Sequence, residues 1–397
     1  MPPRLRVLVV TAFTPRRPDD GDALVLAHHL RHLAVRHELT VLSADSRADL
    51  VPAGGPLPPS VVLTGFAAEQ LGAVSGLVRR AVSLLRRRPA HELWVERPAL
   101  VSAYTEALLD RPDLVYLFGW GTAQLVRQAE AAGIPVVHMP VDGWSDGAAN
   151  RALSGWRRAL ESGQQPLIEA HERRYYPQCA AVVVVAPAEA ALLSARAPGA
   201  RVEVVVNGVD LPAAPPVPKD DGTIAFHGAM STRANQDAAR VAALELLPRV
   251  RRQQPGARLR LIGRGVGPDV AGLAGPAVEV TGEVADVAAA LARCTCYVAP
   301  MVSGSGIKNK VLEAMACGLP VAATVRAVDG IVTGDGVVVS DDLDVLADAL
   351  SAWLADPAAA AAAGALVRDR VRDEQSWQRS AESLEAIWLR VVSAARG

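Results

Sequence analysis

Short apolar runs alternate with helical stretches along most of this chain, and this alternation restricts the fold more than any other feature of the sequence. The first run, Leu5–Val10, is uninterrupted, as is typical of a parallel strand covered on both faces. A helix is predicted next, over Ala23–Arg36. The alternation predicts an α/β protein with doubly wound parallel sheets, which bind ligands at the carboxyl ends of their strands. Further strands are predicted at Leu39–Ser43, Leu93–Glu96, Leu114–Phe118, Ile134–Met139, Ala181–Val185 and Val202–Val206.

A proline-rich segment, Pro212–Pro218, divides the alternation into two series. With 397 residues the chain is longer than a single core usually supports, so two domains joined by this linker are expected. We predict a first domain over residues 1–211, a second over 212–376 and a closing amphipathic helix over 377–397. In the second series, strands are predicted at Thr223–Phe226, Arg258–Ile262, Val278–Thr281 and Cys294–Pro300, with helices near 235–251 and 285–293.

The segment Ser303–Thr324 joins a glycine-rich loop, an amphipathic helix and a short strand. Gly304 and Gly306 allow a ligand to approach the backbone, and a helix that begins near Lys308 would direct its free N–H groups at the loop. The pattern therefore predicts an anion-binding site. The helix is expected to end at Gly318. Its predicted apolar face consists of Val311, Leu312, Met315 and Ala316.

Lysine is rare in this chain. Among 41 Lys and Arg residues, only Lys219, Lys308 and Lys310 are lysines. Two of the three thus stand in one helical turn beside the glycine loop, which favours a compact point charge placed there for phosphate. The alternative is an ordinary pair of surface lysines in the first turn of a helix.

Composition excludes several classes of function. A net charge of −1 and an aromatic content of 4% give no general affinity for nucleic acid. The four cysteines have no zinc-site spacing and are expected to be small buried hydrophobes, which fits a reducing cytoplasm. The first apolar run is too short for a signal sequence, and no window reaches the ~18 apolar residues of a membrane-spanning helix. We expect a bacterial, cytoplasmic protein.

Residues 71–88 have apolar side chains at helical spacing, with five arginines between them. Two interpretations remain open. The segment can lie on an anionic surface, which would make the protein peripheral at the inner membrane, or it can meet an anionic acceptor. It can equally be a domain helix with a solvated basic face.

The segment GIKNKVLEAMACGLPVAAT resembles the C-domain signature of the nucleotide-sugar-dependent glycosyltransferases of family 4. The resemblance extends through Phe226–Met230, Leu261–Gly263 and Thr281–Val284, and more loosely to Val136–His138 and Asn207–Asp210 in the first half. It implies the GT-B architecture, in which two Rossmann-like domains face one another and a C-terminal helix crosses back to the first domain. It also implies a nucleotide-sugar donor and a glycan, glycolipid or small-molecule acceptor.

The resemblance also implies roles for individual residues. Glu313 matches a glutamate that accepts hydrogen bonds from the donor ribose, and His138 matches a histidine near the reacting centre of the sugar; a structural role for His138 is the alternative. Asp20 or Asp22 could engage an acceptor hydroxyl or amine. The remaining residues implied to lie along the donor are Gly21, Gly228, Gly263, Arg264, Val284, Gly304, Ser305, Gly306 and Ile307.

Two departures from the family pattern affect the site. Ser305 stands where a glutamate is common, and Met230 and Asn235 stand where an arginine and a lysine usually bind the diphosphate. We predict that Lys308 replaces this cationic pair, with Arg264 or Arg233 as helpers. On this hypothesis Lys308→Ala weakens donor binding more than Lys310→Ala.

The resemblance implies a retaining transfer in which His138, Lys308 and Glu313 lie closest to the reaction. A helix N-terminus and Lys308 could stabilise the leaving diphosphate, so neither a metal ion nor another cofactor is expected. One alternative is a nucleotide-sugar 2-epimerase or hydrolase of the same architecture, which would use carboxylates such as Glu96 and Asp142. Another is an inactive glycosyltransferase-like partner protein.

Overall fold

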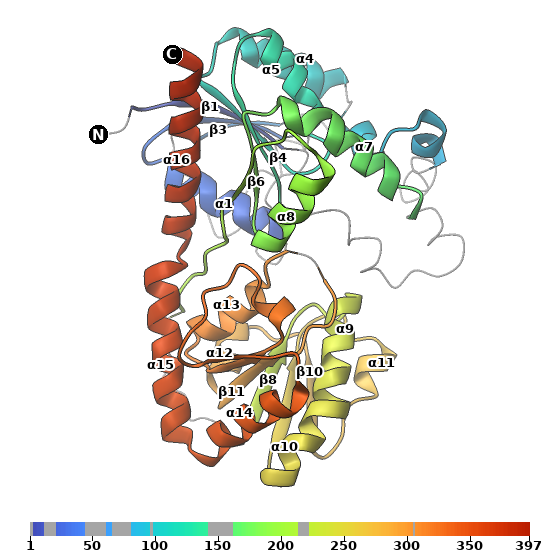
Figure 1. Ribbon diagram of the computed structural model, residues 1–397, viewed down its shortest axis with the longest axis vertical. Helices are drawn as coiled ribbons and strands as arrows, with labels where there is room; N and C mark the ends of the chain where they lie inside the picture. Colours follow the sequence, from blue (N-terminus) through green and yellow to red (C-terminus); the bar gives the residue numbers. More distant parts are fainter. Residues whose placement is uncertain are drawn as a thin grey trace. The chain divides into compact units, whose positions relative to one another are not determined.

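The computed structural model describes residues 3–11, 21–43, 61–65, 81–95, 98–141, 162–212, 222–304 and 306–397. The described residues fall into two compact units (Figure 1). The first contains those of Met1–Ala148 and Leu153–Val205 together with Trp377–Gly397, and the second contains those of Val206–Ser376. The division between the units falls before the predicted linker, of which residues 213–218 lie outside the described residues.

The first unit is built on a parallel sheet with the strand order β3-β2-β1-β4-β5-β6-β7. The central strand β1 pairs with β2 on one side and with β4 on the other, and Val9 and Val10 within it are fully buried. Continuous apolar strands are what a sheet covered on both faces requires. The strands are β1 (Arg6–Thr11), β2 (Glu38–Ser43), β3 (Val61–Gly65), β4 (Leu114–Phe118), β5 (Val136–Val141), β6 (Ala181–Val184) and β7 (Val202–Val204).

The C-terminal helix α16 (Trp377–Arg396) packs on the first unit beside α1 (Gly21–Leu33) (Figure 1). The Trp377 ring stacks on His28 at 4.3 Å between centroids, and the fully buried Trp388 meets Tyr116 of β4 at 5.2 Å. The other helices of this unit are α3 (Ala90–Val95), α4 (Pro98–Leu109), α5 (Val126–Ala131), α7 (Gln165–Tyr175) and α8 (Pro187–Arg196), with 3₁₀ turns η2 (Ala123–Leu125) and η4 (Tyr176–Gln178).

The second unit has its own parallel sheet, with the order β10-β9-β8-β11-β12-β13. Its strands are β8 (Thr223–His227), β9 (Arg258–Ile262), β10 (Val278–Gly282), β11 (Cys296–Ala299), β12 (Val321–Ala323) and β13 (Val337–Val339). Its helices are α9 (Arg233–Arg240), the π-helical η5 (Val241–Leu246), α10 (Leu247–Gln253), α11 (Pro268–Ala271), α12 (Val287–Ala292), α13 (Asn309–Ala316), the 3₁₀ turn η6 (Val325–Val328), α14 (Leu343–Ala355) and α15 (Pro357–Glu374).

The predicted α/β class with doubly wound parallel sheets is confirmed. One strand prediction is wrong, because Leu93–Glu96 was predicted as a strand and residues up to Val95 belong to helix α3. A run of a few apolar residues cannot by itself distinguish a strand from a buried helical segment. The edge strands β3 and β13 were not predicted.

No single helix in the described part of the chain is both long and apolar enough to cross a membrane. One pair of helices, α14 and α15, reaches that length and composition together, and it is bent by 113° between them.

Helix α13 packs against α15 through a direct approach of two backbones. Gly318 ends α13 with a positive φ of 74°, as predicted, and a Cβ placed on Gly364 of α15 would stand 2.0 Å from the Gly318 carbonyl oxygen. Arg368, one turn further along α15, donates a hydrogen bond to the carbonyl of Ala316. Position 364 therefore admits only glycine without movement of α13.

Gly364→Ala tests this contact, because helix propensity and the backbone clash change the free energy of unfolding in opposite directions. Helix propensity alone would make the change stabilising by about 1 kcal/mol. The clash with Gly318 is expected to reverse the sign, with a loss of about 2 kcal/mol or more in the free energy of unfolding. Urea titration measures it. Ala365→Gly, at an exposed position of the same helix, gives the propensity term alone, and a neutral or stabilising Gly364→Ala would contradict the packing described.

Candidate functional site

The sheet of the second unit reverses its winding between β8 and β11. Strands β9 and β10 follow β8 on one side, whereas β11 pairs with the opposite edge of β8 and continues to β12 and β13. The loops that leave the carboxyl ends of β8 and β11 therefore separate, and in α/β sheets ligands bind at such a switch point. Helix α9 follows the first of these loops and α13 follows the second.

Glycines keep side chains away from the carboxyl ends of β8 and β9. Gly228 and Gly263 have positive φ angles of 157° and 146°. A Cβ on Gly263 would lie 1.8 Å from the Gly228 carbonyl oxygen, so the two loops touch through bare backbone. The predicted placement of both glycines beside a ligand fits this geometry.

Glu313 of α13 is joined to the end of β8. Its Oε2 lies 2.7 Å from Nε2 of His227, the last residue of the strand. Burial alone would raise the pKa of Glu313, but the hydrogen bond and charge of His227, together with the charge of Lys310, hold it below its ordinary value. The Glu313 side chain is still 44% exposed, so it can accept further hydrogen bonds.

Lys310 connects the two helices at the switch point. Its Nζ donates to Oδ1 of Asn235 in α9, and Nδ2 of Asn235 donates to the carbonyl of Ala229 at 2.9 Å. Burial and the neighbouring Lys308 lower the pKa of Lys310 to about 8, against a smaller opposing effect of Glu313. The ammonium therefore lies beside Asn235, the residue that the resemblance aligns with a lysine.

Lys308 has a different environment from the one predicted for it. It immediately precedes α13, it is 7% exposed, and its Nζ donates to the carbonyls of Gly304 at 3.3 Å and Gly306 at 2.5 Å. Gly304 and Gly306 have φ angles of 105° and 66°, which favour glycine. The Lys308 side chain thus holds the glycine loop in place.

The other predicted donor residues occupy varied positions. Arg264 is exposed, and Val284 and Ile307 are half-buried in the loops after β10 and β11. Met230, which stands where the family pattern has an arginine, is fully buried. Gly21 is the first residue of α1 in the other unit. Predictions for Ser305, Asp20, Glu96 and Asp142 fall outside the described residues.

His138 lies within β5, which continues beyond the predicted end at Met139 to Val141. Its side chain is fully buried and its Nδ1 lies 3.1 Å from the carbonyl oxygen of Leu117 on β4, while burial lowers its pKa to about 3. These contacts fit the alternative that His138 is structural. A contact with a sugar stays a prediction.

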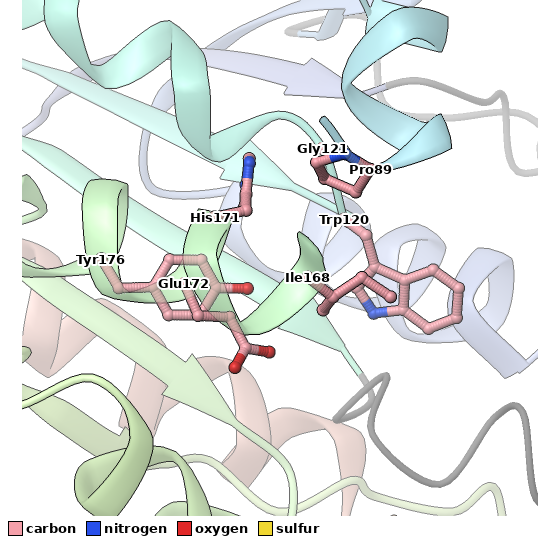
Figure 2. A pocket seen from close by; sticks show the side chains of 7 residues that line it. All are labelled: Pro89, Trp120, Gly121, Ile168, His171, Glu172 and Tyr176. Atoms are coloured by element: carbon pink, nitrogen blue, oxygen red, sulfur yellow. The ribbon is translucent and has the colours of Figure 1, made fainter. Parts of the chain in front are cut away.

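The first unit contains a small pocket next to its own switch point, between β1 and β4. Trp120 and Gly121, which follow β4, line it together with the first half of η4 and one face of α7 (Figure 2). The lining residues are Pro89, Trp120, Gly121, Ile168, His171, Glu172 and Tyr176.

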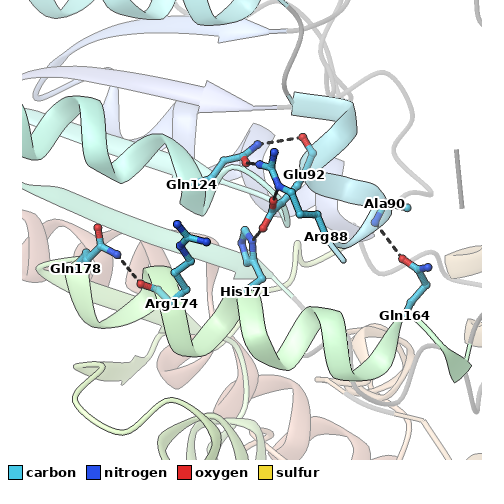
Figure 3. A network of polar contacts seen from close by, with 8 residues as sticks. All are labelled: Arg88, Ala90, Glu92, Gln124, Gln164, His171, Arg174 and Gln178. Carbon is cyan, nitrogen blue, oxygen red and sulfur yellow. Dashed lines mark hydrogen bonds and ion pairs between the residues drawn. The ribbon is translucent and has the colours of Figure 1, made fainter. Parts of the chain in front are cut away.

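A polar network adjoins this pocket through His171 (Figure 3). Arg88 donates to Glu92 and, at 2.9 Å, to Gln124, so this arginine of the predicted basic segment 71–88 is directed at its own domain. Arg86 and Arg87 are exposed, and residues 71–80 lie outside the described residues. Both interpretations of the segment therefore remain open.

Sequence reasoning did not select His227 as a site residue. Its signal was present, because it directly follows the predicted strand Thr223–Phe226 and precedes Gly228 in the segment Phe226–Met230. The pairing with Glu313 spans 86 residues of sequence, and no local pattern reveals such a contact.

Two family models match the chain. Residues 20–212 match the model described as Glycosyltransferase Family 4, and residues 221–356 match the model described as Glycosyl transferases group 1. The chain is 27% identical to the D-inositol 3-phosphate glycosyltransferase of Mycolicibacterium paratuberculosis (strain ATCC BAA-968 / K-10), with 98% of this chain and 91% of the relative covered. It is 26% identical to the protein of the same name from Mycobacterium avium (strain 104), with 98% and 95% covered.

Solved structures share the fold at low sequence identity. Anabaena HepE in complex with UDP superposes with a TM-score of 0.66 at 14% identity, covering 96% of this chain and 99% of the other. TarM superposes with a TM-score of 0.68 at 9% identity, covering 96% and 98%. HepE has also been crystallised with UDP and glucose.

Because the chain contains only three lysines, the protonation of Lys310 can be measured directly. In protein labelled with ¹³C at lysine Cε, one of three side-chain signals is expected to titrate at about pH 8, well below the ~10.4 of an ordinary lysine. Lys310→Arg should remove that signal and leave the other two. Three signals that all titrate near the ordinary value would contradict the burial of the ammonium at the switch point.

Proposed function

Because this chain belongs to the glycosyltransferases of family 4, with the GT-B architecture, we propose that it moves a sugar from a nucleoside diphosphate donor to a hydroxyl or amine of an acceptor, with retention of configuration and without a metal ion. The observation that carries the proposal is the pair of contacts across the switch point of the second unit, from Lys310 to Asn235 and from Glu313 to His227. Together they place a cation and a hydrogen-bond acceptor where a ligand of an α/β sheet binds.

Glu313 is suited to bind the donor ribose. One carboxylate oxygen of Glu313 is hydrogen-bonded to His227, and the partly exposed Glu313 side chain can accept further hydrogen bonds from the vicinal hydroxyls of the ribose. The HepE crystals contain UDP and, in one case, glucose, which supports a nucleoside diphosphate sugar as the donor here.

Positive charge for the diphosphate comes from several groups of the second unit. They are Lys310, the free N–H groups at the start of α13 and the backbone of the loop around Gly304 and Gly306. Such fixed charges stabilise a leaving diphosphate without a bound metal.

The proposed step is a front-face displacement. The bond between the anomeric carbon and the phosphate oxygen breaks, the acceptor oxygen or nitrogen bonds to the same face of that carbon, and the proton of the acceptor goes to the departing phosphate. Lys310 and the N-terminus of α13 stabilise the negative charge that develops on the phosphate. A front-face displacement of this kind requires no second carboxylate beside the donor sugar.

The alternatives remain a 2-epimerase or hydrolase and an inactive partner protein. A location in the bacterial cytoplasm, peripheral to the inner membrane through residues 71–88, stays a prediction. The acceptor is expected to bind to loops of the first unit, as the resemblance implies.

Calorimetric titration with UDP, GDP, dTDP and ADP, with and without EDTA, tests the donor site of the full chain. We expect saturable binding of one nucleotide that EDTA does not change. Incubation with the matching nucleotide sugar and a panel of acceptors should then give a glycosylated product with the anomeric configuration of the donor, read by NMR. Epimerised or hydrolysed donor alone would favour the first alternative, and binding without turnover the second.

Lys308→Met and Lys310→Met, two isosteric neutral variants, distinguish the roles of the two lysines. Because Lys310 offers its charge at the switch point while Lys308 binds loop carbonyls, Lys310→Met should weaken nucleotide binding by about 10- to 100-fold and Lys308→Met by less. Affinity should also fall as the pH rises above about 8, where Lys310 loses its proton, and only Lys310→Met should abolish that dependence. A larger loss in Lys308→Met would restore the sequence-based assignment.

A further inference from the structure

The pocket beside the switch point of the first unit contains a buried carboxylate that the proposed function does not use. Glu172 on α7 is 3% exposed, and its Oε2 has no hydrogen-bond partner among the described residues. Burial, assisted by the charge of Glu169, raises the pKa of Glu172 to about 7 against the opposing charges of Arg196 and Arg173. A buried acceptor without a donor costs free energy, so this position calls for a partner.

Glu92 provides an internal comparison. It is also 3% exposed, but it accepts from Nδ1 of His171 at 2.5 Å and from Arg88, and these contacts hold its pKa below the ordinary value although burial alone would raise it (Figure 3). The carboxylate of Glu92 thus has hydrogen-bonding partners within the protein, whereas Oε2 of Glu172 has none among the described residues. Of these two residues, Glu172 is the one that lines the pocket.

A second polar atom of the pocket also lacks a partner. Nε2 of His171, whose side chain lines the pocket, is buried without a hydrogen-bond partner among the described residues. An ionised carboxylate such as Glu172 can only accept hydrogen bonds, so a ligand group that donates one would satisfy it.

The size and the lining of the pocket restrict which ligand group can bind there. Its volume is about 20 Å³, little more than the ~10–15 Å³ that one water molecule needs, so it admits one small group and not a ring. Figure 2 shows the side chains of Trp120 and Glu172 on either side of Ile168, with Tyr176 behind Glu172. A cation in this pocket compensates both the missing hydrogen bond and the buried charge of Glu172.

We propose that this pocket, which Trp120 and Tyr176 also line, is a subsite for a primary ammonium group of the acceptor held by the Glu172 carboxylate, and that the acceptor is therefore an amine-bearing small molecule. The inference rests on the proposed function, since it assigns a feature of that acceptor. The ammonium is a recognition group, and the sugar is transferred to another atom of the same molecule.

Matched small probes test the subsite in the full chain. At about pH 8, where Glu172 is ionised and an aliphatic amine of pKa ~10.4 is protonated, trans-4-aminocyclohexanol should bind at least about tenfold more tightly than trans-1,4-cyclohexanediol in an NMR titration. Glu172→Gln should abolish this preference. Glu169→Gln, which changes a partly exposed carboxylate on the same helix, should retain it.

Equal binding of the two probes, or binding of neither, would overturn the proposal and leave the pocket as the site of a water molecule. Titration of the same samples with the nucleotide that binds the second unit separates the two hypotheses. Nucleotide binding without an amine preference refutes the subsite only, whereas absence of nucleotide binding refutes the proposed function. Should Glu172→Gln fail to fold, Trp120→Leu is the second variant, and an undiminished amine preference in it would equally overturn the proposal.

Discussion

The reversal of winding in each sheet is the constraint on which the rest of the molecule depends. Two neighbouring parallel strands whose connections leave in opposite directions cannot cover the space above their carboxyl ends with their own loops. In the second unit this opening lies between β8 and β11, and in the first it lies between β1 and β4. Lys310 and Glu313 lie at the opening in the second unit, and Glu172 lines the pocket beside the opening in the first unit.

The two openings differ in how charge is balanced. In the second unit Glu313 and Lys310 stabilise one another, since burial alone would neutralise both and each favours the charged form of its neighbour. In the first unit Glu172 has no such neighbour in contact, whereas Glu92 a short distance away has two. One opening is thus organised before a ligand arrives, and the other requires the ligand to complete it.

The sequence was sufficient wherever the determining interactions are local. Helix α13 was predicted with its buried face and its glycine terminus because caps, periodicity and breakers lie within one segment; Val311, Leu312, Met315 and Ala316 are all fully buried. Sequence reasoning failed where an element or a contact depends on residues far away in the sequence. The edge strands β3 and β13 are short, α3 contains an ambiguous apolar run, and the contacts of Lys310 and Glu313 span 75 and 86 residues. Composition could identify the pair Lys308 and Lys310, but not the acceptors that each contacts, because these depend on which residues the fold brings near.

Helix α16 has a consequence for the order in which the molecule can form during synthesis. It follows the second unit in the sequence, yet it supplies Trp388 against Tyr116 and places Glu385 3.0 Å from the buried His37 of the first unit. The second unit, by contrast, is essentially one continuous stretch of chain that is complete before α16 emerges. The first unit is therefore begun before the second but completed after it, and part of its apolar surface stays uncovered until α16 has been synthesised.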